Sequence, residues 1–281
     1  MDKPIPILLY HSVAEQVAPG FRRWCVHPQL FAAHMAYLHE HRYTPLTVSQ
    51  LVQAMHDPRV HLPPRPVVLT FDDALADFYT GALPVLTRYG FAATLYIPTG
   101  FVGGTSRWLA PQGEGERPML NWQQIIEISD SHIECGAHSH HHAQLDVIPP
   151  AQARQEIEDS KATLEERLGQ PVTSFAYPHG YYTSQVRQMV VQADFSSACA
   201  VKYALSALTD DCFALARLLV RGDTDVTQFA ALLSGKAQRV APRREPVKVK
   251  AWRWLRRAVY IARVHTTSRM GSCELSRRGM S

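Results

Sequence analysis

The sequence predicts an α/β protein in which parallel strands close into, or nearly into, a β/α barrel. Short apolar runs alternate with helical patterns along most of the 281 residues, which is typical of parallel strands joined by helical crossovers. The chain has no internal repeat and contains neither a GxGxxG nor a GxxxxGK[ST] motif. A nucleotide-binding loop is therefore not indicated.

The elements follow from local patterns. Strands are expected where apolar residues cluster in short runs, over 5–10, 43–46, 66–71, 91–97, 133–138, 173–177, 197–201 and 213–220. Helices are expected over 74–89, 122–128, 149–168, 185–193 and 227–233, with two more beginning at Pro28 and after Thr47 or Ser49. The stretch 100–117 is rich in Gly and Pro and predicts a long functional loop.

The composition is that of an ordinary soluble globular protein, with 46% apolar and 19% charged residues. The five cysteines are scattered and form no CxxC pair, which argues against a disulfide framework and a thiolate metal site and suits a reducing compartment. The apolar run near the N-terminus is too short for a signal peptide, and no stretch approaches 18 apolar residues. We therefore expect a cytoplasmic protein.

Charge divides the chain into two parts. Residues 236–281 contain 13 Lys and Arg against 2 acidic residues, a net charge of +11. Because the whole chain carries +4, residues 1–235 carry −7. We expect one folded domain over 1–235 and a separate basic tail over 236–281.

Two adjacent carboxylates, Asp72 and Asp73, follow the apolar run 66–71 directly. A helical pattern comes next, so the acids are expected at the carboxyl end of a strand, where β/α folds place their chemistry. Neighbouring carboxylates repel each other, and a metal ion or a shared proton would offset that repulsion. The alternative is an Asp that caps the helix beside a solvated neighbour.

A histidine cluster, 138–142, stands at the end of another expected strand. His138 and His142 with one carboxylate would make a metal set that leaves positions open for water and substrate. Such a site lowers the pKa of a bound water to about 7. A hydrophilic loop that merely contains many histidines is the alternative.

Three motifs in order, TFDD, H-S-x-x-H-x-x-L and FAYPHG, resemble those of the polysaccharide deacetylases (the NodB-homology fold, carbohydrate esterase family 4). The segments ILLYHSV, YTPLTVSQL and FALARLLV resemble the branch with an N-terminal YH motif. The resemblance covers about residues 4–235. It implies a distorted (β/α) barrel and metal-dependent removal of N-acetyl groups from amino sugars, with zinc, cobalt or nickel as the metal.

Carried over by motif, the resemblance implies that Asp73, His138 and His142 bind the metal and that Asp72 is the catalytic base. A carboxylate bonded to a cation does not readily take a proton, so the free neighbour must act on the water. A backbone N–H near Tyr177, in the Tyr177-Pro178 segment, would stabilise the oxyanion.

The group that protonates the leaving amine is less clear. Many relatives use a Leu-x-x-His motif late in the domain, but after His179 the only histidine is His265, in the basic tail. We expect His11 of the YH motif to be the acid, with His179 as its rival where the family usually has an aromatic residue. Arg217, in LARLLV, resembles an arginine that pairs with the catalytic acid, and a structural ion pair is the alternative.

Partners are predicted less sharply. Trp108 in the long loop could stack on a sugar ring or pack against the edge of the core. Residues 251–264 could form a basic amphipathic helix on an anionic membrane, with disordered sequence after it, or the tail could be a solvated extension. No nucleic-acid partner is expected. Besides an N-acetylated carbohydrate, the alternatives are deacetylation or deformylation of a lipid- or nucleotide-linked sugar, and a non-catalytic carbohydrate-binding protein.

Overall fold

The computed structural model describes residues 4–235, 239–241, 254–258 and 260. Parallel strands form a curled sheet in the order β11 (Leu218–Leu219), β1 (Ile7–Tyr10), β5 (Pro66–Phe71), β6 (Ala93–Ile97), β7 (Ile133–Ala137), β8 (Ser174–Ala176) and β9 (Ser197–Cys199), while β4 (Thr44–Leu46) pairs with the first half of β5. A single parallel bridge between Cys199 and Leu215 links the β9 edge to the segment that leads into β11. The sheet is thus an open barrel, and the predicted fold class is confirmed.

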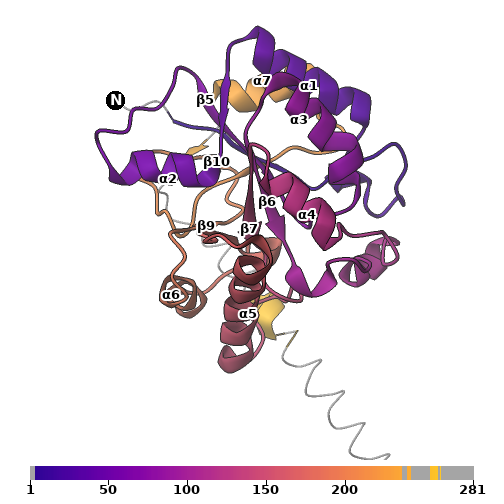
Figure 1. Cartoon of the computed structure of the whole chain (residues 1–281), viewed down its shortest axis with the longest axis vertical. Coiled ribbons are helices and arrows are strands. Elements are labelled where there is room, and N and C mark those ends of the chain that lie inside the picture. Colours follow the sequence, from indigo (N-terminus) through magenta and orange to yellow (C-terminus); the bar gives the residue numbers. More distant parts are fainter. Residues whose placement is uncertain (1–3, 236–238, 242–253, 259, 261–281) are drawn as a thin grey trace, which may run out of the picture.

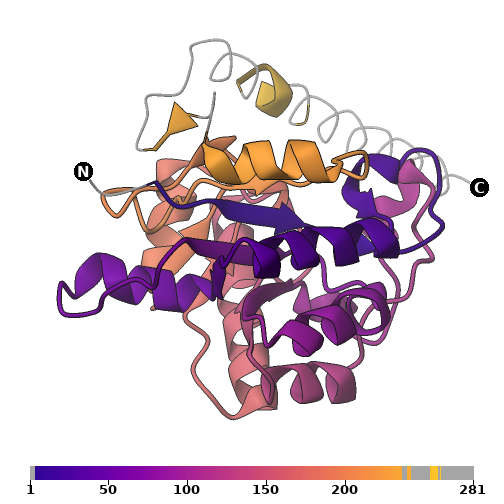
Figure 2. The same cartoon turned by 90° about the horizontal axis from the view of Figure 1, so that it is seen from above.

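Among the described residues, six helices cover the outer face of this sheet (Figures 1 and 2). They are α1 (Pro28–Glu40), α3 (Leu83–Tyr89), α4 (Trp122–Ser129), α5 (Pro150–Leu168), α6 (Ser184–Gln192) and α7 (Val226–Ser234). A further α-helix, α2 (Val48–His56), packs against the interior of the barrel at the amino ends of the strands. Two short pairs complete the described part, β2 (Ser12–Val13) with β3 (Cys25–Val26), and β10 (Ala204–Leu205) with β12 (Arg239–Val240).

Successive side chains along a strand point to opposite faces of the sheet, so the buried apolar residues form two layers, one beneath the helices and one inside the barrel. In β5, Leu69 and Phe71 belong to the large cluster beneath the helices, whereas Val68 belongs to a second cluster inside the barrel. Leu51 and Val52 of α2 are buried in that inner cluster. The interior is therefore packed beneath the site, and the carboxyl ends of the strands carry the polar groups.

Helix termini follow the local sequence. Capping boxes at Thr47, Asn121 and Asp225 begin α2, α4 and α7. Gly90 and Gly169, both in the left-handed conformation, end α3 and α5 as predicted.

Two elements differ from their prediction. The helix expected from residue 74 starts later, because Asp73 and Ala74 adopt positive φ angles of 78° and 50° that no helix accommodates. A π-helical segment, Phe78–Ala82, then precedes α3. The strand expected over 213–220 is reduced to β11, since Leu215 makes only the isolated bridge to Cys199.

Part of the basic tail can be described. Residues 254–258 and 260 are helical, in agreement with part of the helix predicted over 251–264. The remainder of that prediction, and the disorder expected after it, fall outside the described residues. Among the described residues, no helix combines the length and the apolar character needed to cross a bilayer.

Candidate metal centre and active site

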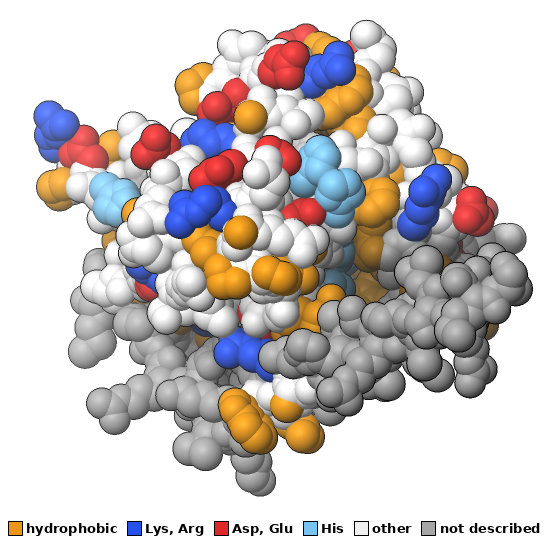
Figure 3. All heavy atoms as spheres, turned by 90° about the horizontal axis from the view of Figure 1, so that it is seen from below, with side chains coloured by type: hydrophobic (Ala, Val, Ile, Leu, Met, Phe, Trp, Pro, Cys, Tyr) orange, Lys and Arg blue, Asp and Glu red, His pale blue; other side chains and the backbone are white. Residues whose placement is uncertain are grey.

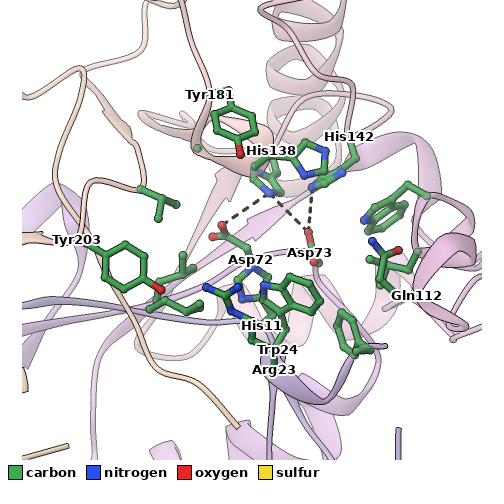
Figure 4. A pocket seen from close by; sticks show the side chains of 18 residues that line it. His11, Arg23, Trp24, Asp72, Asp73, Gln112, His138, His142, Tyr181 and Tyr203 are labelled. Atoms are coloured by element: carbon green, nitrogen blue, oxygen red, sulfur yellow. Dashed lines mark ion pairs between the residues drawn. The ribbon is translucent and has the colours of Figure 1, made fainter. Parts of the chain in front are cut away.

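The polar side chains of interest follow the carboxyl ends of neighbouring strands. His11 follows β1, Asp72 and Asp73 follow β5, and His138 and His142 follow β7. Because parallel strands end at the same edge, these side chains converge on one pocket (Figure 4). The chain leaves regular geometry there, with positive φ at Asp73, Ala74, Ser139, His142 and His179. Such clustered strain is typical of functional sites.

Asp73, His138 and His142 form a set that could hold a metal ion. The Nε2 atom of His142 lies 3.2 Å from Oδ1 of Asp73, and that of His138 lies 3.6 Å from the same oxygen. All three side chains are buried, and one ligand atom from each lies within 4.8 Å of the others. Sequence and structure therefore select the same three residues.

Hydrogen bonding around this set fits a cation. The Nδ1 atom of His138 lies 2.8 Å from the carbonyl oxygen of Ala176. A carbonyl only accepts, so Nδ1 carries a proton, and Nε2 is the atom that would offer its lone pair to a cation. Oδ1 of Asp73 is buried without a hydrogen-bond donor among the described residues. Lone pairs that face one another in a buried site suit a divalent cation between them.

Asp72 is held differently from its neighbour. Arg217, fully buried inside the barrel, donates to both carboxylate oxygens of Asp72 at 2.6 and 2.8 Å and also to Oγ1 of Thr70. Burial alone would raise the pKa of Asp72, but the Arg217 guanidinium and then His138 outweigh it, so the pKa lies below its ordinary value. The carboxylate is thus ionised and fixed in orientation.

His11 and His179 both line the pocket. Burial lowers the pKa of His11, and the charges of Asp73 and Asp72 oppose that shift. Its Nδ1 atom has no hydrogen-bond partner among the described residues. Burial, with His142 nearby, lowers the pKa of His179 to about 3, so this ring is neutral near pH 7. Its ring centroid lies 4.7 Å from that of His142.

The backbone near Tyr177 is the predicted source of an oxyanion donor. The N–H of Tyr177 donates to the carbonyl of Cys199, and its hydroxyl donates to the carbonyl of Phe213. Pro178 has no N–H to offer. Neither of these two residues therefore has a free N–H, and the donor near Tyr177 stays a prediction.

The pocket has a volume of about 330 Å³. Trp108 forms one wall and stacks on His142 with centroids 4.8 Å apart. It therefore covers a candidate metal ligand and also faces the pocket. Two of the neighbouring histidines, His140 and His141, bond instead to Thr99 and Glu156.

Sequence reasoning missed several residues that line the pocket, namely Arg23, Trp24, Gln112, Tyr181 and Tyr203. Figure 4 shows Trp24 and Tyr203 on different sides of the two carboxylates. All of these residues lie outside the quoted motifs. Arg23 and Trp24 belong to the 3-10 helix 22–24, Gln112 ends the 3-10 helix 107–112, and the two tyrosines lie in loops. For the three aromatic residues, their position outside the regular strands was the only sequence signal of a binding role, and that signal is weak. Arg23 and Gln112 carried no signal.

Comparison with known proteins places this site in a family. Residues 59–198 match the family profile described as polysaccharide deacetylase. The chain carries a polysaccharide deacetylase domain. It is thereby a hydrolase that acts on amide bonds. A Bacillus subtilis protein named as a polysaccharide deacetylase, YxkH, is 27% identical over 237 residues, covering 83% of this chain and 77% of that protein.

Two further relatives show the range of the likeness. The poly-β-1,6-N-acetyl-D-glucosamine N-deacetylase of Escherichia coli K12 is 29% identical over 135 residues, 46% of this chain but only 20% of that protein. The solved structure of the Streptococcus pyogenes deacetylase PplD, in complex with acetate, superposes with a TM-score of 0.72 at 24% identity, over 83% of this chain and 99% of that one. The deacetylase domain therefore shares its fold with PplD.

Proposed function

We propose that this polysaccharide deacetylase is a metal-dependent hydrolase that removes N-acetyl groups from the amino sugars of an oligo- or polysaccharide. The observation that carries the proposal is the division of labour between adjacent acids. Asp73 faces His138 and His142 with an unpartnered oxygen, whereas Arg217 holds Asp72 outside that set. The name of the E. coli relative supports an N-acetylated glucosamine as the substrate.

Asp73, His138 and His142 would hold the cation, with zinc expected and cobalt or nickel as alternatives. When bound, the cation would supply Lewis-acid chemistry, polarising the amide carbonyl and lowering the pKa of a water. Asp72 accepts the proton of the attacking water, and Arg217 keeps the carboxylate ionised and aimed into the pocket.

Two other groups complete the reaction. The N–H of His179, two residues after Tyr177 in a segment that lines the pocket, donates to the developing oxyanion. His11, which follows β1 next to β5, delivers a proton to the leaving amine. Residues 1–235 form the catalytic domain in this proposal, and the cytoplasmic location stays a prediction.

The experiment measures acetate release from a panel of N-acetylated substrates, including β-1,6-linked N-acetylglucosamine oligomers and nucleotide- and lipid-linked N-acetyl sugars. Chelated protein and protein reloaded with zinc, cobalt or nickel are compared. We expect release only with metal, and its loss in Asp72→Asn by about 10²–10⁴-fold. Asp194→Asn is the matched control, because Asp194 is exposed on the far side of α6 and its positive φ of 58° suits Asn.

Stoichiometric metal binding without acetate release from any member of the panel would overturn the deacetylase proposal. Formate release from N-formyl sugars would then identify a deformylase. Failure of both, with retained sugar binding, would identify a carbohydrate-binding relative.

A further inference from the structure

The exposed large apolar residues of the described surface lie outside the helices α1–α7. They are Tyr203 (45%), Val240 (44%), Trp254 (71%), Leu255 (56%) and Tyr260 (36%). Isolated exposed apolar residues are common and need no explanation. Trp254 and Leu255, however, are adjacent and are the two most exposed of the five. Exposed apolar residues that lie together mark a candidate interaction surface.

The group borders the catalytic pocket. Tyr203 lines the pocket itself. Val240 lies in β12, which pairs with β10, the strand that directly follows Tyr203. In Figure 2, β12 and the described tail helix lie on the same side of the barrel as α7.

Trp254, Leu255 and Tyr260 belong to a segment that two arginines anchor to the body. Arg256 donates to Asp146, and Arg257 donates to the same carboxylate at 3.2 Å. The Asp146 side chain is fully buried. A buried carboxylate without a cationic partner is strongly destabilising, so the two arginines stabilise Asp146 when the tail helix binds the deacetylase domain. The contacts of Arg256 and Arg257 with Asp146 therefore fix the tail helix at one place on the deacetylase domain.

The anchor also reaches the pocket wall. Arg256 lies 4.0 Å above the ring of Tyr181, which lines the pocket, and it donates to Gln144 in the loop that begins at His142. Since the arginines face the body, the neighbouring Trp254 and Leu255 are left exposed to solvent. Hydrophobic and basic side chains lie next to one another on this face, at the border of the undescribed residues (Figure 3).

We propose that the tail surface, defined as Trp254, Leu255 and Tyr260 with Tyr203 and Val240, docks on an anionic lipid bilayer beside the pocket mouth. Tryptophan favours the membrane interface, and Leu255 would insert next to it. The net charge of +11 over residues 236–281 complements anionic headgroups. A nucleic acid would also use the charge and could stack a base on Trp254, but the exposed aliphatic Leu255 and Val240 gain burial in a lipid layer and not on a base.

Docking has a consequence for the substrate, which rests on the proposed function. A pocket held against a bilayer receives an acylated sugar carried on a membrane lipid more readily than a free one. We expect acetate release from an N-acetyl sugar on a lipid carrier in anionic vesicles to exceed release in neutral vesicles. Release from a soluble N-acetylated oligosaccharide should be the same with either vesicle.

The experiment sediments the full chain with vesicles of phosphatidylcholine alone or with added phosphatidylglycerol. We expect binding that requires the anionic lipid and falls by at least about tenfold in the double variant Trp254→Ser/Leu255→Ser, because both apolar side chains lose their burial. The double variant keeps every arginine and should release acetate from a soluble oligosaccharide as the unchanged protein does. Val60→Ser, a partly exposed residue in the loop that precedes β5, is the control for apolar loss elsewhere.

Three outcomes would overturn the docking. The chain could fail to bind either vesicle, or the double variant could bind like the unchanged protein, which would mean that charge alone acts. A dimer in solution that the double variant dissociates would identify a second copy as the occupant. Vesicle binding without any acetate release would leave the docking standing and overturn the proposed function alone.

Discussion

At the carboxyl end of the strands, Oδ1 of Asp73 and Nδ1 of His11 are buried without partners among the described residues, whereas at the amino end Glu134 is fully bonded. Its carboxylate accepts from the N–H and hydroxyl of Ser49 and from the hydroxyl of Thr94, the last at 2.7 Å. Buried polar atoms are ordinarily paired, because leaving one unpaired costs about 1–3 kcal/mol. Among the described residues, the barrel accepts that cost at the end where substrate and cation would bind and avoids it at Glu134.

Histidines repeat this contrast. His34 is buried with both ring nitrogens bonded, to the Tyr10 hydroxyl at 3.3 Å and the Thr224 carbonyl at 2.9 Å, and it stacks on Phe229. His11 is half-buried, and its Nδ1 atom is buried in the pocket without a partner among the described residues. The difference suggests that His34 contributes to stability and His11 to chemistry, and variants can separate the two.

The largest effect is expected for His11→Ala. If His11 is the acid, kcat should fall by about 10²–10⁴-fold while the metal content is unchanged. His179→Phe is the matched variant, because it keeps a ring against His142 and removes the rival imidazole. Steady-state kinetics and metal analysis of both proteins decide the assignment. Equal losses in the two variants, or none in His11→Ala, would reject His11 as the acid.

A large loss of stability is expected for Arg217→Met. Asp72 would remain buried without its cation, at a cost of about 3–5 kcal/mol in the free energy of unfolding at pH 7. Arg187→Met is the control, since Arg187 and Asp211 form an equally short pair with side chains 33% and 38% exposed. Such a pair is worth about 0–1 kcal/mol. Urea unfolding of both variants measures the difference.

The same pair predicts a pH dependence. Because the pKa of Asp72 is lower in the folded protein than in the unfolded chain, its contribution is fully present above the unfolded value of about 3.9. It is lost as the pH falls through the folded pKa. Unfolding curves from pH 6 to pH 3 should therefore converge for the unchanged protein and Arg217→Met. A constant gap between the two curves would show that Arg217 acts through packing instead.

The gain in unfolding free energy on metal binding compares Asp73, at the carboxyl end of the strands, with Glu134, at the amino end. Saturating zinc should raise the free energy of unfolding of the chelated protein by about 2.7 kcal/mol at a hundred times its Kd. Asp73→Asn should lose most of that gain. Glu134→Ala should keep the gain but lower both the chelated and the loaded protein by about 1–3 kcal/mol, since the donors at Ser49 and Thr94 lose their acceptor. An equal gain in Asp73→Asn would place the cation elsewhere.

The sequence could predict the ends of the strands but not the walls of the pocket. Apolar runs that stop at Asp72 or at His138 fix where a parallel strand ends, and the topology then brings those ends together. Arg23 and Tyr203 carry no such signal, because loops that are distant along the chain bring them into the pocket. Their placement depends on tertiary packing, which local periodicity does not encode.

One local error has a physical cause. Helical periodicity continues back to Ala74, but the strained φ angles at Asp73 and Ala74 delay the helix. The N–H of Tyr177 bonds to the carbonyl of Cys199, so an oxyanion donor near Tyr177 would have to come from a neighbouring residue. Backbone details of this kind are difficult to predict, because sequence patterns report side chains more faithfully than backbone geometry.

The smallest effect concerns His34 and separates stability from chemistry. Burial lowers the pKa of His34 to about 4, with the Thr224 carbonyl opposing the shift. The unfolded chain, with a pKa of about 6.5, therefore binds more protons than the folded protein between these two values. Stability should fall as the pH drops from 6.5 toward 4, by roughly 2 kcal/mol at pH 5. His34→Gln should flatten this slope, whereas His61→Gln, on the exposed loop before β5, should keep it. Because His34 does not line the pocket, kcat at pH 7 should be unchanged in His34→Gln. A loss of kcat without a change in the slope would contradict the division between the two histidines.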